Sequence, residues 1–184
     1  MRAVLLEVPQ AMLDERRRMG LDERDEMWDG VLHMVSPPGE LEKEFGGELF
    51  LVLGPLAKER GLRACYETAL FRTSDDYRVP DQLYCRPEHR SERTAKGAEL
   101  VVEILAEDDE TYEKISFYRG LGVREVLIVH PLQRRVELLR VVGDQMLPVS
   151  GDVDGAVRSD VLDAQFRTAA GRLRVTWQDG RSEL

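Results

Sequence analysis

The stretch "ELVVEILA", residues 99–106, decides the fold class. It is a nearly continuous apolar run of strand length, which is typical of a central strand covered on both faces. The segment "DDETYEKISFYRGLG", residues 108–122, follows almost at once. It has aspartates suited to capping a helix, acids for the first turn, and Gly120 or Gly122 as a stop. A buried strand that leads directly into a helix predicts an α/β protein.

The segments on either side of this unit alternate between helical and strand patterns, without an internal repeat or a linker. Helices are expected where apolar residues recur at helical spacing before a glycine stop, at residues 9–19 and 38–61, with Pro55 as a site for a kink in the second. Strands are expected at residues 30–36, 62–72, 77–86, 123–131 and 134–143, with "TSDD" and "PLQR" as hairpin turns, and residues 157–177 should pack at the edge. The order predicts a mixed central β-sheet flanked by helices on both faces.

Composition limits the class of protein. The 184 residues fit one domain, residues 1–184, and 42% hydrophobic residues are enough for a core. No run is long enough to span a bilayer, and the apolar stretch in "MRAVLLEVPQ" is too short for a secretory signal. We therefore expect a cytoplasmic protein without a membrane partner. Cys65 and Cys85 are too few for a disulfide framework and are expected to face a core.

The charge balance argues against non-specific adhesion to nucleic acid. Thirty-five acidic residues oppose 26 basic ones, which gives a net charge of −9. Contact with a polyanion would therefore have to be local and helped by a bound cation.

Two acids stand in places where a strand would not normally carry them. Asp81 follows a proline within "YRVPDQLYC", residues 77–85, and Glu103 lies among aliphatic residues. A buried carboxylate requires a cation, a metal or an opening to solvent. Carboxylates on neighbouring strands, with the main-chain carbonyl of Ile104, would offer the hard oxygen ligands that Mg²⁺ or Mn²⁺ requires. The alternative is an ion pair between Glu103 and an arginine at the end of the sheet.

Lys114 is the third candidate. It lies on the helix that follows Glu103, where its ammonium could reach an attacking water or a phosphate oxygen, and Tyr118 shares its helical face. The alternative is that Lys114 is a solvated ion-pair partner of Glu110 and Glu113.

The succession "DEMWDGVLHMVSPP", "VPDQLY", "ELVVEIL" and "EKISFYRGLGVREVLIVHP" resembles the Uma-two family, restriction-endonuclease-like members of the PD-(D/E)XK nuclease superfamily. The similarity implies a nuclease-like core over about residues 21–170. Asp81 and Glu103 match the metal-binding acids of the family. Lys114 matches a catalytic lysine that has moved from the strand to the helix, and Glu26 matches a further family glutamate.

Four positions depart from the family pattern. Glu42 stands near the position of a frequent histidine, and Ala106 where a small polar residue is common. Glu110 replaces a more usual aspartate, and His130 stands where aspartate is frequent. The acids and the lysine are all retained, and only the missing histidine bears on substrate handling or proton transfer.

The resemblance implies a Mg²⁺-dependent or Mn²⁺-dependent endonuclease that hydrolyses phosphodiester bonds, most often in DNA, alone or as a homodimer. Basic side chains near the Asp81 hairpin could hold backbone phosphates, namely Arg72, Arg78, Arg86, Arg90, Arg93 and Lys96. They could equally be solvated loop charges. The alternative function is a binding or regulatory module that keeps the nuclease fold without catalysis.

Overall fold

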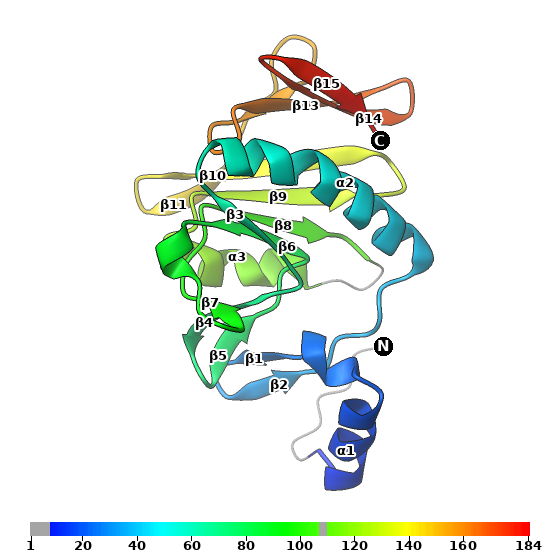
Figure 1. Ribbon diagram of the computed structural model, residues 1–184, viewed down its shortest axis with the longest axis vertical. Helices are drawn as coiled ribbons and strands as arrows, with labels where there is room; N and C mark the ends of the chain where they lie inside the picture. The colour runs from blue at the N-terminus through cyan, green and yellow to red at the C-terminus, as the bar shows by residue number, and fades with distance from the viewer. Residues whose placement is uncertain (1–7, 107–109) are drawn as a thin grey trace.

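The computed structural model describes residues 8–106 and 110–184 (Figure 1). Its centre is a six-stranded sheet in the order β11-β10-β9-β8-β6-β3. The strands are β3 (Arg63–Tyr66), β6 (Gln82–Cys85), β8 (Leu100–Ile104), β9 (Glu125–His130), β10 (Arg135–Val142) and β11 (Gln145–Pro148). β8 and β9 are parallel, whereas the other neighbouring pairs are antiparallel, so the sheet is mixed.

The parallel pair exists because helix α3 (Thr111–Gly120) returns the chain from the end of β8 to the start of β9. α3 covers one face of the sheet, where Phe117 and Tyr118 pack with Val101, Val126 and Ile128. The alternation of side chains along β8 therefore directs Val101 and Glu103 towards the α3 face.

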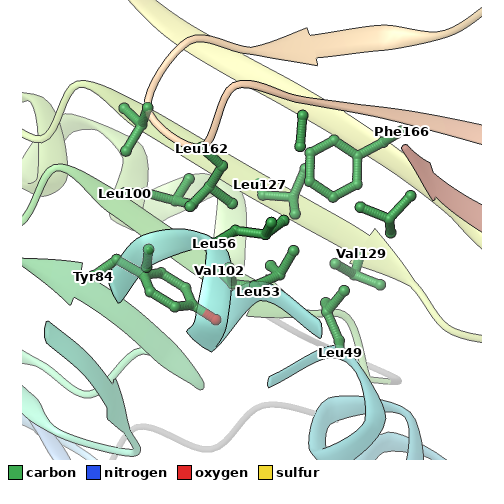
Figure 2. Close-up of a cluster of buried hydrophobic side chains, with 14 of the residues drawn as sticks. Leu49, Leu53, Leu56, Tyr84, Leu100, Val102, Leu127, Val129, Leu162 and Phe166 are labelled. Carbon is green, nitrogen blue, oxygen red and sulfur yellow. The ribbon is translucent and has the colours of Figure 1, made fainter. Parts of the chain in front are cut away.

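The other face is covered by the long helix α2 (Glu40–Glu59). Figure 2 shows its leucines against the strands, and the cluster includes Leu49, Leu53, Leu56, Leu100, Val102, Leu127 and Val129. Phe166 and Leu162, from the C-terminal region, join the same cluster. Pro55 lies inside α2 without ending it.

The C-terminal region forms its own antiparallel sheet. It consists of β12 (Val157–Ser159), β13 (Ala164–Ala169), β14 (Arg172–Trp177) and β15 (Gly180–Glu183), in that order. It packs at the edge of the molecule beside β10 and α2 (Figure 1). The expected position at the edge is confirmed, and the sheet itself was not expected.

A five-stranded sheet, in the order β2-β1-β5-β4-β7, connects the N-terminal region to the rest. Its strands are β1 (Glu26–Trp28), β2 (Val31–His33), β4 (Ala69–Thr73), β5 (Asp76–Arg78) and β7 (Thr94–Ala95). Helix α1 (Gln10–Arg18) and the 3₁₀ helix η1 (Leu21–Arg24) precede it, and η2 (Pro87–His89) follows β6.

The predicted strands at 62–72 and 77–86 each divide into two. β3 and β6 pair in the central sheet, whereas β4 and β5 form the hairpin in the five-stranded sheet, with its turn at the predicted "TSDD". The first break is at Glu67, whose φ of 42° ends the extended backbone. The second is at Pro80, which lacks the N–H that a strand ladder needs.

Other expectations for the fold are confirmed. Helices lie within the expected ranges 9–19 and 38–61 and after 108. Strands lie within the expected ranges 30–36, 99–106, 123–131 and 134–143. Helices also cover both faces of the mixed sheet, as expected. Cys65 and Cys85 are buried free thiols. The predicted aspartate caps, Asp108 and Asp109, lie outside the described residues. Among the helices that the structure describes, none combines the length and the apolar character needed to cross a bilayer.

Candidate active site

The register between β6 and β8 brings Asp81 and Glu103 to the same end of the central sheet. Gln82 is opposite Val102, so the next position outward on each strand places Asp81 beside Glu103. One carboxylate oxygen of Asp81, Oδ2, accepts the main-chain N–H of Ile104 at 2.7 Å. The contact is made through the amide of Ile104, and the metal-binding role of its carbonyl stays a prediction.

Helix α3 supplies the next two side chains. Lys114 Nζ lies 3.3 Å from Oε1 of Glu103, and the hydroxyl of Tyr118 donates a short hydrogen bond to the same oxygen. Both side chains are buried, although Lys114 is 8% exposed. The i, i+4 spacing of Lys114 and Tyr118 and the direction of Glu103 therefore produce the contact that the helical pattern predicts.

Glu26 reaches the same place from the five-stranded sheet. Its Oε1 atom lies 3.0 Å from Lys114 Nζ and accepts the N–H of Val79 at 2.9 Å. Its Oε2 atom accepts the indole N–H of Trp28 at 2.7 Å. Lys114 is thus held between two buried glutamates, Glu26 and Glu103, and the solvated alternative for this lysine is wrong.

The electrostatics of the site are dominated by burial and by excess negative charge. The pKa of Glu103 is raised from its usual value of 4.5 to about 8, mainly by burial; Lys114 lowers the pKa, and the charges of Asp81 and Glu26 raise it. Burial also raises the pKa of Tyr118, with a further contribution from Glu103, so its hydroxyl is a donor. A group with a pKa displaced by burial and by like charges is typical of a functional site.

Arg24 and Glu67 complete the cluster, and no local sequence pattern pointed to either residue. Arg24 Nη2 lies 2.6 Å from Oδ1 of Asp81, and its Nη1 lies 3.1 Å from Oε1 of Glu67. The arginine at the sheet end therefore contacts Asp81, whereas the cation that contacts Glu103 is Lys114.

The chemistry of these donors fits a divalent cation. Three carboxylates, those of Asp81, Glu103 and Glu26, lie around two cations, Lys114 and Arg24. Repulsion from Asp81 and Glu26 contributes, after burial, to the raised pKa of Glu103. A hard cation with oxygen ligands would relieve that repulsion. Within residues 8–106 and 110–184, however, no three acidic, histidine or cysteine side chains already converge as a metal-binding group. A cation would have to replace contacts that are now made by Arg24 or Lys114.

The predicted phosphate-binding residues are placed elsewhere. Arg86 pairs with Glu99, which precedes β8 and so lies at the opposite end of that strand from Glu103. Arg72 pairs with Asp76, while Arg90, Arg93 and Lys96 are exposed in the segment after β6. These side chains remain candidates for contacts to a long substrate.

Arg78 is a correction to that group. It is 5% exposed, and its guanidinium lies between the rings of Trp28 at 4.3 Å and Phe117 at 4.2 Å. It also pairs with Asp76 at 2.9 Å and donates to the carbonyl of Met27. Arg78 therefore links the five-stranded sheet to α3, because its charged head is enclosed and does not face a phosphate.

Three of the positions that depart from the family pattern lie at or next to the ends of helices and strands of the core. Glu42 is in the first turn of α2, and Glu110 precedes α3, where it contacts Nδ1 of His33 at 2.8 Å. His130, at the end of β9, contacts Glu137 at 2.7 Å.

Comparison with known proteins gives a consistent result. No curated protein matches the chain. A solved structure from Anabaena variabilis, described as "a putative nuclease belonging to DUF820", matches with a TM-score of 0.62 and 19% identity, over 82% of this chain and 89% of that one. That likeness shows that the two chains share a fold, in agreement with the expected restriction-endonuclease-like core. The family model Uma2, described as "Putative restriction endonuclease", matches residues 12–171, and the chain therefore belongs to the Uma2 family.

Proposed function

We propose that the protein is a divalent-metal-dependent endonuclease that hydrolyses phosphodiester bonds in DNA. The observation that carries this proposal is the placement of Lys114 between Glu26 and Glu103, at the sheet end that also holds Asp81. A structural ion pair needs one acid for one base. Here three buried acids share two bases, Lys114 and Arg24, and such an excess of acids suits a site that binds a further cation.

Asp81 and Glu103 would hold Mg²⁺ or Mn²⁺, together with the carbonyl of Ile104 and, at the rim of the cluster, Glu26. When bound, such an ion supplies a water of lowered pKa and neutralises charge on the phosphate. The elevated pKa of Glu103 suits this role, because a nearby divalent cation would return its carboxylate to the ionised form.

Lys114 is the chain's own electrophilic group in this proposal. Its ammonium would orient the attacking water or stabilise the negative charge that develops on the phosphoryl oxygens. Glu26 and Tyr118 are positioning residues, since Glu26 fixes the ammonium and the Tyr118 hydroxyl fixes the carboxylate of Glu103.

The substrate would be held by bases outside the acidic cluster. Arg72, Arg86, Arg90, Arg93 and Lys96 are candidates, and their distance from Glu103 suits a polymeric substrate that extends along the surface. A homodimer would allow cleavage of two strands, and the cytoplasm would be the place of action.

The test is a plasmid-nicking assay with Mg²⁺ and with Mn²⁺ that compares the wild type, Asp81→Ala and the exposed control Arg174→Ala. We expect nicking by the wild type and by the control, and loss of nicking in Asp81→Ala. Equal nicking by the wild type and Asp81→Ala, or none by any protein, would contradict the proposal.

One observation favours the second candidate, a nucleic-acid-binding or regulatory module without catalysis. Asp81 already has a cation partner, because Arg24 lies 2.6 Å from it. In this case the protein would retard a labelled DNA duplex in an electrophoretic assay without cleaving it, and the retardation would be independent of divalent ions.

A further inference from the structure

Arg24 is presented to the site by a firmly held segment. η1 begins after Gly20, which has a φ of 68°, and ends at Arg24, just before Asp25. The carboxylate of Asp25 accepts hydrogen bonds from the guanidinium of Arg16 and from the N–H of Val35. The backbone at Arg24 is therefore fixed, while its long side chain can adopt other rotamers without moving the chain.

The guanidinium of Arg24 lies between two carboxylates and is poorly satisfied by either. It donates one hydrogen bond, from Nη2 to Oδ1 of Asp81 at 2.6 Å. Its Nη1 atom is 3.1 Å from Glu67, yet Nε and Nη1 are buried and have no hydrogen-bond partner within residues 8–106 and 110–184. A permanent structural arginine normally uses its fork of donors, whereas this one leaves most of them unused.

Glu67 is placed with some strain. Its φ is 42°, a conformation that residues with a side chain seldom adopt, and its N–H donates to the carbonyl of Asp81 at 3.0 Å. Glu67 is thus tied to Asp81 through the backbone and also through Arg24. Backbone strain of this kind tends to persist where a side chain must be held at a functional position.

Arg24 and a divalent ion would compete for Asp81. Oδ2 of Asp81 already accepts the N–H of Ile104, so a metal ion would bind Asp81 most directly through Oδ1. Oδ1 is the oxygen that Arg24 contacts. Two cations cannot both lie against one oxygen at close range without strong repulsion. Glu67 offers the displaced guanidinium an alternative anion at the same place.

We propose that Arg24 is a latch on Asp81: its guanidinium occupies the Asp81 carboxylate, and a divalent cation must displace it towards Glu67 before the site can act. This inference rests on the proposed function, since it concerns the same metal site. It assigns Arg24 and Glu67 a regulatory role in cation affinity.

The experiment is calorimetric titration with Ca²⁺ alone, at one ionic strength, on the folded full chain. Arg24→Gln should bind Ca²⁺ about tenfold more tightly than the wild type, which corresponds to about 1.4 kcal/mol. Glu67→Gln should bind it about threefold more weakly, because Arg24 loses its alternative partner. Arg17→Gln, which changes a 70% exposed arginine of the same region, should leave the affinity unchanged.

An Arg24→Gln affinity equal to or weaker than that of the wild type would overturn the latch, and so would the absence of binding in every variant. If the wild type binds Ca²⁺ through Asp81 but Arg24→Gln gains nothing, the latch is wrong while the nuclease proposal stands. If Arg24→Gln binds more tightly but no protein cleaves DNA, the latch stands while the nuclease proposal fails.

A second measurement titrates the wild type, and uses Arg24→Lys only to assign a resonance, in case Arg24→Gln does not fold. The Nε–H resonance of Arg24, assigned by comparison with Arg24→Lys, should shift as Ca²⁺ is added, while that of Arg17 should not. An Arg24 resonance that is unchanged at saturating Ca²⁺ would contradict displacement.

Discussion

Two glutamates are buried on the neighbouring parallel strands β8 and β9, and they lie at opposite ends of the pair. Glu103 is 3% exposed and Glu125 is 1% exposed. Glu125 accepts hydrogen bonds from Arg140, from the hydroxyl of Ser159 and from the N–H of Asp160. Glu103 instead shares Lys114 with Glu26 and lies near Asp81.

The difference between them lies in the balance of donors and charges. Glu125 is surrounded by donors and joins the C-terminal sheet to the central one, which is a structural role. Glu103 instead shares one cation, Lys114, with Glu26 and lies beside a third acid, Asp81, which is less favourable for stability and suits the binding of a further cation. Burial alone therefore does not identify a functional acid, whereas the identity of its neighbours does.

The largest expected effect is on catalysis at the Glu103 end. Lys114→Met should lower the rate of DNA cleavage by about 10³-fold, because it removes the positive charge that stabilises the transition state. The measurement is single-turnover cleavage of an end-labelled duplex with Mg²⁺. Arg140→Met, at the Glu125 end, is the matched control and should keep the wild-type cleavage rate per folded molecule. An equal loss of cleavage rate in Lys114→Met and Arg140→Met would contradict the different roles of the two ends.

The next effect is on stability at the Glu125 end. Glu125→Gln should lower the free energy of unfolding by about 2 kcal/mol, because Arg140 loses one carboxylate partner at 2.8 Å and keeps Asp160 as a partner. Urea denaturation followed by circular dichroism measures the change. A loss below about 1 kcal/mol would show that these contacts are dispensable.

The pH dependence of stability should separate the two acids further. The folded-state pKa of Glu103 is raised from 4.5 to about 8, so the folded protein binds a proton that the unfolded chain releases above pH 4.5. Stability from this group is therefore present below pH 4.5 and is lost as the pH rises towards 8. The wild type should lose roughly 2 kcal/mol relative to Glu103→Gln between pH 5 and pH 7.

Thermal unfolding of both proteins across that range provides the measurement. Parallel stability curves for the wild type and Glu103→Gln would show that Glu103 is ionised throughout, contrary to expectation. Saturating Ca²⁺ should reduce the difference in pH dependence between the wild type and Glu103→Gln, since the cation favours the ionised carboxylate of Glu103.

The smallest effect concerns the hydroxyl groups that contact the two glutamates. Tyr118→Phe should reduce cleavage by about tenfold and stability by about 1 kcal/mol, because it removes one hydrogen bond to Glu103. Ser159→Ala should cost a similar amount of stability without changing cleavage. Cleavage assays and denaturation curves for each variant separate the role of Tyr118 in cleavage from the structural role of Ser159. An equal effect of both substitutions on cleavage would contradict this difference.

Much of this site could be predicted from the sequence because its residues lie on strongly patterned elements. Asp81 and Glu103 interrupt strand patterns, and Lys114 lies on the predicted helix that follows, whereas only the family resemblance pointed to Glu26. The structure brings all four together. The roles proposed for them in metal binding and catalysis are still to be tested. The three-layer core was predictable for the same reason, since the apolar run of β8 requires cover on both faces.

Other parts depend on contacts that no local pattern encodes. Arg24 and Asp81 are 57 residues apart in the chain. Glu67 lies beside them because its backbone has a positive φ, which cannot be predicted from a glutamate in the sequence. No sequence pattern links Trp28 to Glu26, yet the indole N–H of Trp28 donates a hydrogen bond to the Glu26 carboxylate. Arg78 reads as a loop cation, yet aromatic rings enclose it, which only the packing of α3 reveals.

The most direct test of the account compares the two buried glutamates in one assay. Glu103→Gln and Glu125→Gln make the same chemical change on adjacent strands, and each is measured for Mg²⁺-dependent cleavage of a labelled DNA duplex, with rates normalised to folded protein. The account predicts that Glu125→Gln cleaves at the wild-type rate and that Glu103→Gln does not cleave. Cleavage by Glu103→Gln at the wild-type rate would contradict it.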